Sequence, residues 1–330
     1  MQRESLRHKA KHELKRLESA TYEAFLSDVL QGLSQPQKSL PCKWLYDEYG
    51  AMLFEEITQT PEYYLTRTET RLLRKLGQEI AHEIPNLKIL IEPGSGSSVK
   101  TRLLLQALPT LEQYIPIDIS EEMLLDAAEQ LQQEFPALRV QPHVHDFSMP
   151  VPPLLRFTEE GQRLVFFPGS TIGNFSPKEA QRLLRSFDAL VRHDGWLLLG
   201  VDTTRDKHIV LPAYDDTAGI TAQFNMNLLV RINRELEANF NPARFRHKAI
   251  FNSLESRIEM HLVSQQAQTV QIAGHMVVFE PGESIHTENC YKYPLATVER
   301  MAQACGWELS QTWTDETGTG FVVILFKSAR

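Results

Sequence analysis

The sequence has little cysteine and no long hydrophobic run. Its three cysteines are far apart and none belongs to a C-x-x-C pair, which argues against a disulfide framework and a thiolate zinc site. Such cysteine usage fits a reducing compartment. No apolar run approaches the roughly 18 residues that a membrane-spanning helix needs. We therefore expect a protein of the cytoplasm that does not insert into membranes.

An excess of positive charge is also lacking. Lysine and arginine number 34 against 42 aspartates and glutamates, and the formal net charge is −8. This balance argues against nucleic acid and against an anionic membrane surface as partners. The first 19 residues are charged throughout and contain no apolar segment, so we expect no secretory signal. With 330 residues, 42% of them hydrophobic, the chain is long enough for one large domain or two smaller ones.

What the sequence does have is an alternation of short apolar runs and helical patterns, beginning at residue 87. Apolar runs typical of buried strands lie at 87–92, 113–120, 139–147, 163–171 and 195–204. Helical patterns follow the first, second and fourth run, and the last of these helices begins with a capping box from Ser176 to Glu179. This alternation predicts an α/β fold with a doubly wound, parallel sheet.

The alternation breaks after residue 204. A helical stretch and three strand-like runs up to residue 293 predict an antiparallel α+β patch, and a helix with two strands at 294–328 predicts an antiparallel hairpin that closes the main sheet. We therefore expect two discontinuous domains. The first comprises residues 70–203 and 292–330, and the second residues 1–69 and 204–291.

The loop after the first expected strand reads "EPGSGSSVKT" (92–101). Val99 stands where a phosphate-binding P-loop and a dinucleotide loop each require glycine. An acidic residue followed by G-x-G is instead the pattern of S-adenosylmethionine sites, in which Gly94 and Gly96 let the backbone approach the cofactor. That cofactor has no phosphate, so Val99 does not count against it. Taken alone, the loop is also compatible with an ordinary strand–helix turn.

Acidic residues also stand at the next two strand ends, and ligands of open parallel sheets bind at the carboxyl ends of the strands. Asp118 is placed to accept hydrogen bonds from both ribose hydroxyls, a role that NAD enzymes share. Asp146, with the amide of Phe147, is placed to meet the adenine. His143 and His145 precede Asp146, but strand alternation puts both imidazoles on the face opposite the carboxylate. A metal site is the weaker interpretation, and we expect no metal.

The fourth strand end carries Asn174, four residues after "PGS". Amine methyltransferases place substrate-contacting groups at this strand end, and an asparagine amide can both donate and accept hydrogen bonds. The alternative role for Asn174 is to cap the following helix beside Ser176.

Several motifs, in matching order and separation, resemble the L-histidine Nα-methyltransferases of ergothioneine biosynthesis. They run from about residue 40 to the end of the chain and include "LFEEITQTPEYYLTRTE", "GSGSSVKT", "IPIDIS", "STIGNF", "AYDDTAGITAQFN", "IEMHL" and "HTENCYKY". The resemblance implies a Rossmann-like class I methyltransferase domain that binds S-adenosylmethionine, and a discontinuous α+β domain that binds the substrate. It implies a monomer that trimethylates the α-amine of L-histidine to give hercynine.

Carried over by position, the resemblance also implies the site residues. Five are implied for the cofactor: Gly94, Lys100, Asp118, Asp146 and Phe147. Two are implied for the substrate carboxylate, Asn174 and Tyr214, and two for the imidazole, Tyr63 and Glu288. Four more are implied to line the substrate pocket: Phe54, Met260, Asn289 and Cys290. Tyr46 is implied to lie near the amine; we expect it to orient this group, because a tyrosine with a pKa near ~10 is a poor base.

Two alternatives remain open. The family often has serine two residues after the glutamate, as a second partner of the imidazole. This chain has Cys290, a weak hydrogen-bond partner, so a modified histidine or a tryptophan derivative is an alternative substrate. Glu288 favours histidine, because an indole pocket gains less from a buried charge. The alternative of another class is a nucleotide- or NAD-dependent enzyme or a catalytically silent binding module. Thermal stabilisation by S-adenosylhomocysteine, but not by NAD or ATP, would dismiss this alternative.

Overall fold

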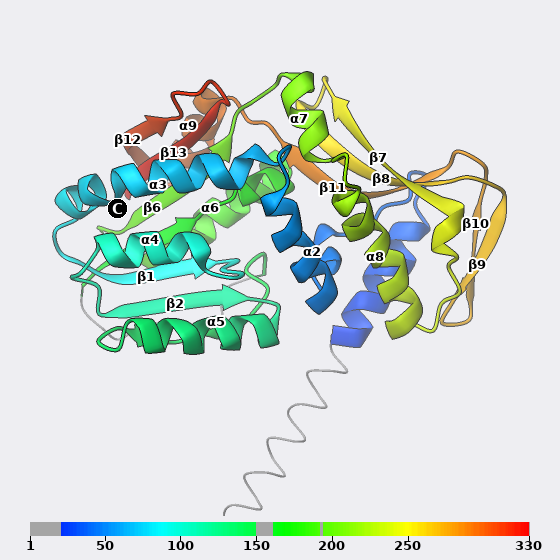
Figure 1. The fold of residues 1–330 in the computed structure, drawn as a ribbon, viewed down its shortest axis with the longest axis horizontal. Coiled ribbons are helices and arrows are strands. Elements are labelled where there is room, and N and C mark those ends of the chain that lie inside the picture. Colours follow the sequence, from blue (N-terminus) through cyan, green and yellow to red (C-terminus); the bar gives the residue numbers. More distant parts are fainter. Residues whose placement is uncertain (1–20, 150–160, 192–193, 330) are drawn as a thin grey trace, which may run out of the picture. The chain divides into compact units, whose positions relative to one another are not determined.

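A computed structural model describes residues 21–149, 161–191 and 194–329 (Figure 1). The chain forms two compact units, each assembled from separate stretches of sequence. The larger unit comprises Phe54–Ala218, Ile250–Ile258 and Asn289–Arg330. The smaller unit comprises Met1–Leu53, Gly219–Ala249 and Glu259–Glu288. Residues 54–69 and 204–218, which the sequence pattern assigns to the second domain, lie in the larger unit.

The larger unit is built around an eight-stranded sheet, whose order is β12-β13-β6-β5-β1-β2-β3 with β4 also paired to β2. Four central strands run parallel: β1 (Leu87–Pro93), β2 (Gln113–Asp118), β5 (Gln162–Phe167) and β6 (Trp196–Asp202). The last two strands, β12 (Trp307–Thr314) and β13 (Phe321–Ser328), form an antiparallel hairpin that continues the sheet from β6. The predicted α/β fold with a C-terminal antiparallel hairpin is confirmed.

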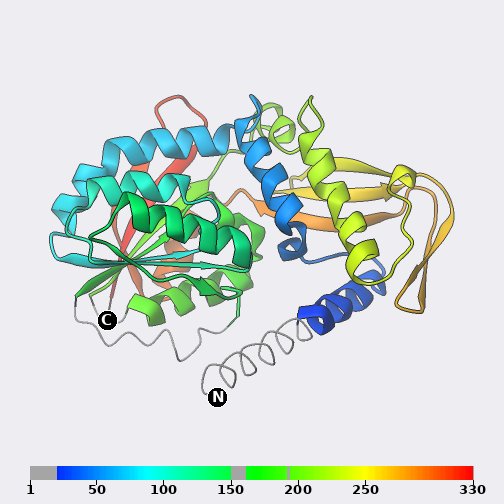
Figure 2. The same ribbon diagram turned by 60° about the horizontal axis from the view of Figure 1, so that its bottom comes forward.

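Helices cover both faces of this sheet (Figure 2). On one face, α6 (Pro177–Val191) and α9 (Leu295–Gln303) form a continuous apolar core with alternate residues of β1, β2, β5, β6 and β13. On the other side α3 (Tyr64–Glu83) packs against α4 (Val99–Ala107) and against β12 and β13. The helix α5 (Glu121–Glu134) packs against β2 and β3. Burial from both sides explains why the central strands read as unbroken apolar runs.

Two strands are shorter than predicted. The run 139–147 contains two separate strands, β3 (Arg139–Val140) and β4 (His143–Val144), each parallel to β2. Pro142 lies between them and interrupts the ladder, because proline has no N–H to donate. The run 163–171 ends as a strand at Phe167 and turns through Gly169, whose φ is +80°, into the 3-10 helix η3 (Thr171–Asn174).

A second sheet has the strand order β11-β8-β7, and a hairpin joins β9 and β10. These strands are β7 (Phe245–Asn252), β8 (Arg257–Ser264), β9 (Gln268–Ile272), β10 (His275–Phe279) and β11 (Ser284–Tyr291). The predicted run 269–280 is split into β9 and β10 by Ala273 and Gly274, which both have positive φ. The sequence pattern did not predict β7, most of whose side chains are partly exposed.

Further helices complete the two units. They are η1 (Cys42–Leu45), α2 (Glu48–Gln59), α7 (Lys207–Ala213), α8 (Ile220–Glu235) and η4 (Pro242–Arg244). Residues 21–33 are also helical, as their apolar spacing predicts. Within the smaller unit α8 packs against η1 and η4.

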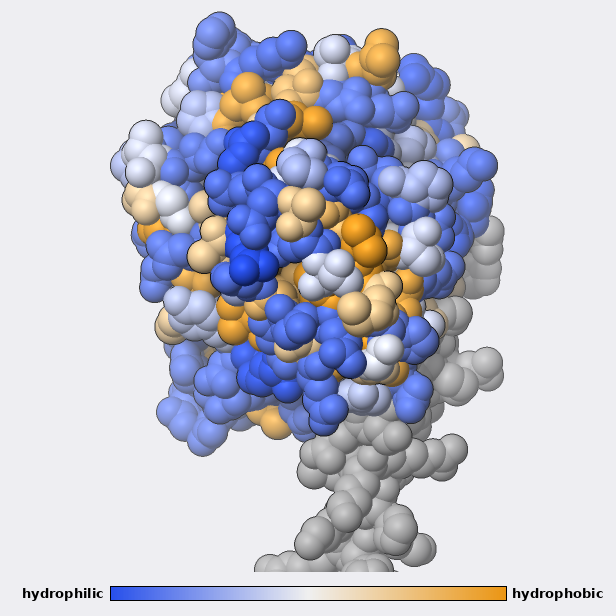
Figure 3. All heavy atoms as spheres, turned by 90° about the vertical axis from the view of Figure 1, so that its right-hand side faces the viewer, coloured by the Kyte–Doolittle hydropathy of each residue, from blue (hydrophilic) through white to orange (hydrophobic). Residues whose placement is uncertain are grey.

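In the described ranges, no helix combines the length and the apolar character that crossing a membrane requires. The face of the molecule drawn in Figure 3 is largely hydrophilic, and its apolar residues form small groups separated by polar ones. Two of the exposed apolar side chains of the smaller unit, Met276 and Val278, lie on β10.

Candidate cofactor and substrate site

The glycine loop after β1 makes a close backbone approach. Gly94 has φ +72°, in the left-handed region that favours glycine, and its N–H donates to the carbonyl of Ile117 at 2.7 Å. A Cβ at Gly94 would lie 3.1 Å from the ring of Phe147, so the predicted first and third strand ends meet here. The hydroxyl of Ser95 in this loop is buried and has no hydrogen-bond partner among the described residues. A buried hydroxyl without a partner in the protein is available for a hydrogen bond with a ligand.

Asp118 stands at the end of β2 and fastens the same loop. Its Oδ2 accepts from the N–H of Gly96 at 3.1 Å, and its Oδ1 accepts from the N–H of Ser120 at 3.0 Å. The side chain is partly exposed. These hydrogen bonds hold the Asp118 carboxylate beside the glycine loop. Each of its oxygens can accept a further hydrogen bond from a ligand.

Asp146 and Phe147 follow β4. The Oδ1 of Asp146 accepts from the N–H of Ser148 at 2.9 Å and from its hydroxyl at 2.5 Å. The ring of Phe147 packs edge-to-face against Phe167, with centroids 5.6 Å apart, and against Phe175 at 6.2 Å. This packing holds the Phe147 ring against Gly94.

Lys100, which is partly buried, forms an ion pair that the sequence did not indicate. Its Nζ lies 2.5 Å from Oε2 of Glu69, and the side chain of Glu69 is 1% exposed. Both carboxylate oxygens of Glu69 also accept from the N–H of Gly169, at 3.0 and 2.8 Å. Glu69 on α3 therefore connects the loops after β1 and β5. Lys100 keeps further N–H donors, because an ammonium has three.

Glu92, the acid of the acid-x-G-x-G pattern, is fully buried behind the loop. Its Oε2 accepts from the hydroxyls of Thr101 and Tyr114, each at 2.5 Å. Burial raises the pKa of the Glu92 carboxyl to about 7 despite these hydrogen bonds. Glu92 therefore supports the loop from inside the sheet.

Most of the predicted substrate residues belong to the larger unit and are close to one another. The ring centroid of Tyr63 lies 6.1 Å from that of Phe54 and 6.3 Å from that of Tyr214. Tyr63 and Tyr214 are both buried. The Tyr214 hydroxyl in turn donates to Sγ of Cys290 at 2.8 Å. Four residues from three separate stretches of the sequence are thereby linked.

Asn174 adjoins the same group through its neighbour Gly173. A Cβ at Gly173 would lie 3.3 Å from Sγ of Cys290 and 2.9 Å from the carbonyl of Tyr291, so η3 approaches β11 closely. Tyr214 thus contacts Cys290 directly, and Asn174 is the residue after Gly173, which approaches Cys290 closely. The Oδ1 of Asn289 is buried without a hydrogen-bond partner among the described residues, and it offers an acceptor to a ligand N–H.

A buried lysine, which the sequence patterns did not single out, completes this group. Lys292 is fully buried, and its Nζ lies 2.6 Å from Oδ2 of Asp202, 3.2 Å from the Tyr214 hydroxyl and 3.3 Å from Sγ of Cys290. Asp202 also accepts from the hydroxyl of Tyr64 at 2.6 Å. Asp202 is the last residue of β6. Because ligands of parallel sheets bind at the carboxyl ends of the strands, the end of this fifth predicted strand could have been identified as a candidate site in the same way as the others.

Three predicted substrate residues lie in the smaller unit. The ring of Tyr46, which follows η1, packs edge-to-face on Phe224 with centroids 5.3 Å apart. Met260 on β8 is buried, and its carbonyl accepts from the hydroxyl of Thr287 at 3.1 Å. Glu288 on β11 is also buried. Met260 and Glu288 thus lie on neighbouring strands.

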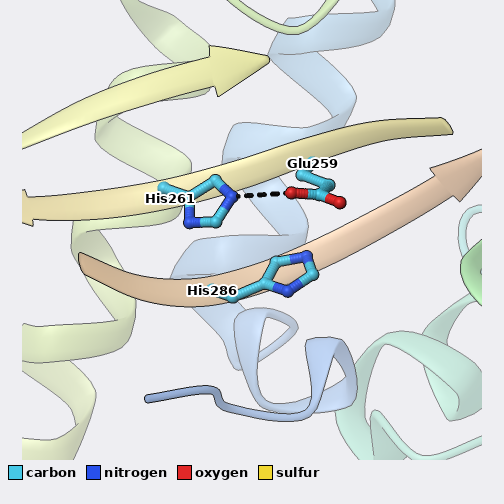
Figure 4. A group of neighbouring side chains, drawn as sticks. All are labelled: Glu259, His261 and His286. Carbon is cyan, nitrogen blue, oxygen red and sulfur yellow. Dashed lines mark hydrogen bonds and ion pairs between the residues drawn. The ribbon is translucent and has the colours of Figure 1, made fainter. Parts of the chain in front are cut away.

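Next to Glu288, the side chains of Glu259, His261 and His286 point toward one another (Figure 4). Each offers one potential metal-ligating atom, and these atoms lie within 4.8 Å of one another. The two imidazoles are stacked, with planes only 17° apart. Since the nitrogen lone pairs lie in the ring planes, near-parallel rings do not direct them at one ion.

Hydrogen bonds account for the cluster as it stands. The Nε2 of His261 lies 3.1 Å from Oε2 of Glu259, and its Nδ1 lies 3.2 Å from the hydroxyl of Ser284. The Nε2 of His286 lies 3.0 Å from the carbonyl of Glu288. We interpret the cluster as a support for the strand that carries Glu288.

His143 and His145, considered above as metal ligands, each have a buried Nε2 with no hydrogen-bond partner in the described part of the chain. Burial lowers the pKa of His143, and the neighbouring His145 contributes in the same direction. In the described residues, the His143–Asp146 segment does not form a group of three convergent ligands.

Comparison with known proteins places this geometry in context. The model of the family "Histidine-specific methyltransferase, SAM-dependent" matches residues 25–328. A histidine N-alpha-methyltransferase of Mycobacterium tuberculosis is 40% identical over 306 residues, which cover 91% of this chain and 94% of the relative. One of Mycolicibacterium smegmatis is 40% identical over 302 residues, covering 90% and 92%. Ergothioneine biosynthesis protein 1 of Neurospora crassa is 30% identical over 293 residues, covering 84% of this chain and 32% of the relative.

Proposed function

Since the chain belongs to the S-adenosylmethionine-dependent, histidine-specific methyltransferases, we propose that it trimethylates the α-amino group of L-histidine to give hercynine. The match to this family over residues 25–328 carries the proposal. Hercynine formation is the first step of ergothioneine biosynthesis, in agreement with the names of the fungal relatives. The clustering of Tyr63, Asn174, Tyr214 and Cys290 in one unit supports an amino-acid substrate.

The larger unit offers a matching site for S-adenosylmethionine. Gly94 supplies the close backbone approach and Ser95 an unsatisfied hydroxyl. We assign the cofactor's carboxylate to Lys100, whose charge is held in place by Glu69. We assign the ribose hydroxyls to Asp118 and the adenine to Asp146 and Phe147. When bound, the cofactor supplies a methyl group on a positively charged sulfur. No metal is needed for this transfer.

For the substrate, we assign the carboxylate to Asn174 and Tyr214, because both can donate hydrogen bonds to an anion. Tyr63 and Glu288 are assigned to the imidazole. A carboxylate accepts a hydrogen bond from the imidazole N–H, which favours histidine over tryptophan derivatives. Four residues are assigned to the lining of the substrate pocket: Phe54, Met260, Asn289 and Cys290.

Methyl transfer requires an uncharged amine lone pair in line with the methyl group, so the contribution of the protein is largely alignment. Tyr46 is assigned to orienting the amine. The amine must lose a proton before each early transfer, and an ordinary tyrosine is a weak acceptor for it. Aromatic faces also tolerate the growing positive charge of the methylated amine through cation–π contacts. Tyr63 and Phe54 offer such faces.

We further propose that the larger unit binds the cofactor, that residues of the smaller unit complete substrate recognition, and that the protein acts as a monomer in the cytoplasm. Size-exclusion chromatography with light scattering tests the monomer.

One assay tests the function directly. Purified protein is incubated with S-adenosylmethionine and an equimolar mixture of the amino acids, and the products are identified by mass spectrometry. We expect mono-, di- and trimethylated histidine to appear in order, with hercynine as the end product. Methylation of another amino acid, with histidine unchanged, would overturn the assignment. A tryptophan derivative and a ring-modified histidine, added in separate reactions, test the alternative substrates.

A further inference from the structure

Lys292 is a buried cation beside a residue assigned to substrate binding. Its side chain is 0% exposed, so the ammonium makes no contact with bulk water. Burial alone favours the neutral amine, but the nearby charge of Asp202 outweighs burial and raises the pKa of Lys292 well above its usual value. Lys292 is therefore charged at neutral pH.

The surroundings of the Lys292–Asp202 pair are asymmetric. On the side of Asp202, Oδ2 accepts from the Tyr64 hydroxyl at 2.6 Å and Oδ1 accepts from the N–H of Thr204 at 3.0 Å. These donors stabilise the carboxylate. On the other side the Lys292 ammonium donates to the Tyr214 hydroxyl at 3.2 Å and approaches Cys290 at 3.3 Å. The positive end of the pair thus faces Tyr214.

This contact changes what the Tyr214 hydroxyl can do. Its oxygen accepts from Lys292, so its own proton is directed elsewhere, and it is donated to Sγ of Cys290 at 2.8 Å. Burial raises the pKa of Tyr214 well above its usual value, so the hydroxyl keeps its proton. A hydroxyl that accepts a charge-assisted hydrogen bond is polarised and becomes a stronger donor to an anion.

We propose that Lys292 is a positioning residue that directs the Tyr214 hydroxyl to the substrate carboxylate, so that the site selects α-amino acids over amines that lack a carboxylate. This inference rests on the proposed function, because it takes Tyr214 as the carboxylate ligand. Lys292 itself acts through Tyr214 and does not touch the substrate. The buried ion pair supplies electrostatic attraction without exposing a lysine that would attract other anions.

Cys290 fits the same scheme. Sulfur is a weak acceptor, so the bond from Tyr214 to Cys290 holds the hydroxyl loosely when no substrate is bound. A carboxylate oxygen is a much stronger acceptor and can take over this proton at little cost. A serine hydroxyl at position 290 would compete better for it.

The test compares two ligands that differ in the carboxylate. Binding of L-histidine and of histamine is measured by isothermal titration calorimetry in the presence of S-adenosylhomocysteine. Three variants are compared with the wild type: Lys292→Met, Asp202→Asn, and the double variant Asp202→Asn with Lys292→Met. Lys292→Met alone leaves the Asp202 carboxylate buried and unpaired, which can prevent folding. The double variant removes both charges and therefore keeps the test possible in that case. Binding of S-adenosylhomocysteine and circular dichroism verify the fold.

We expect both Lys292→Met variants to lose about ten- to hundredfold in affinity for L-histidine, the size of one charge-assisted hydrogen bond, and little for histamine. Asp202→Asn removes the negative charge that keeps the buried amine of Lys292 protonated, so it should also lose part of the preference for L-histidine over histamine. An equal loss for both ligands, or an unchanged preference, would overturn the role of Lys292 while leaving the function intact. Wild-type protein that binds neither ligand would instead refute the proposed function.

Discussion

The close approach of Gly94 to Phe147 makes the glycine loop testable by one methyl group. In Gly94→Ala the new Cβ meets two penalties. The backbone has φ +72°, where an L-residue costs about 1–2 kcal/mol more than glycine. The Cβ also lies 3.1 Å from the Phe147 ring, which is itself held by Phe167 and Phe175.

A matched control separates the two penalties. Gly219 has φ +73°, but a Cβ there meets no atom within 4 Å. Gly219→Ala therefore carries the backbone cost alone. Overpacking a well-packed site adds about 1–3 kcal/mol, so we expect Gly94→Ala to reduce the free energy of unfolding by about 2–5 kcal/mol and Gly219→Ala by about 1–2 kcal/mol.

Two measurements decide the matter. Urea unfolding gives the stability of each variant, and calorimetric titration gives its affinity for S-adenosylhomocysteine. We expect Gly94→Ala to weaken cofactor binding at least tenfold, because the displaced Phe147 is assigned to the adenine, and Gly219→Ala to leave it unchanged. Equal stability and equal affinity in the two variants would refute the close approach and the assignment of this loop to the cofactor.

Three further predictions concern single side chains. Glu92→Gln removes a carboxyl group whose pKa is raised by burial to about 7 in the folded protein. Because the folded protein binds the carboxyl proton more tightly than the unfolded chain does, the contribution of Glu92 to stability falls as pH rises from about 4.5 to 7. The unfolding free energy of Glu92→Gln relative to the wild type should therefore rise by up to about 3 kcal/mol over this window, and a flat difference would contradict the raised pKa. Lys100→Met should raise the KM for S-adenosylmethionine about tenfold and the KM for L-histidine by less. A larger rise in the KM for L-histidine would contradict the assignment of this loop to the cofactor. Glu288→Ala should raise the KM for L-histidine about ten- to hundredfold while sparing S-adenosylhomocysteine binding, and an unchanged KM would favour a substrate other than histidine.

The sequence predicted the fold and the site best where a rule links position to geometry. Buried parallel strands read as apolar runs, so the alternation of those runs with helical patterns predicted the parallel α/β sheet, while the order of its strands came from the structure. Side chains at the carboxyl ends of parallel strands meet at one edge, which brings Gly94, Asp118 and Phe147 together. The family resemblance added residues that no spacing rule reaches, such as Tyr63 and Tyr214, whose rings lie 6.3 Å apart.

The charged residues that hold the site were harder to predict. Glu69 lies on the buried face of α3. The apolar spacing of that helix predicts which face is buried, but it gives no reason for a glutamate on that face. Lys292 directly follows β11, most of whose residues are polar, so nothing marked it as buried. Each forms an ion pair with a residue distant in sequence: Glu69 with Lys100, and Lys292 with Asp202. Pairing of this kind depends on tertiary structure and is not encoded in local periodicity.

The two buried ion pairs suggest a common principle for this larger unit. Each pairs a carboxylate of the protein with a lysine assigned to the recognition of a ligand carboxylate: Lys100 directly for the cofactor, and Lys292, through Tyr214, for the substrate. A counter-ion keeps each cation in place and lowers the cost of burying it. Because Glu69 and Asp202 also bind backbone N–H groups of the loops after β5 and β6, the proposed recognition of both carboxylates depends on the geometry of neighbouring strand ends. A loop displacement at one strand end should therefore weaken the binding of an anionic ligand more than that of its uncharged analogue.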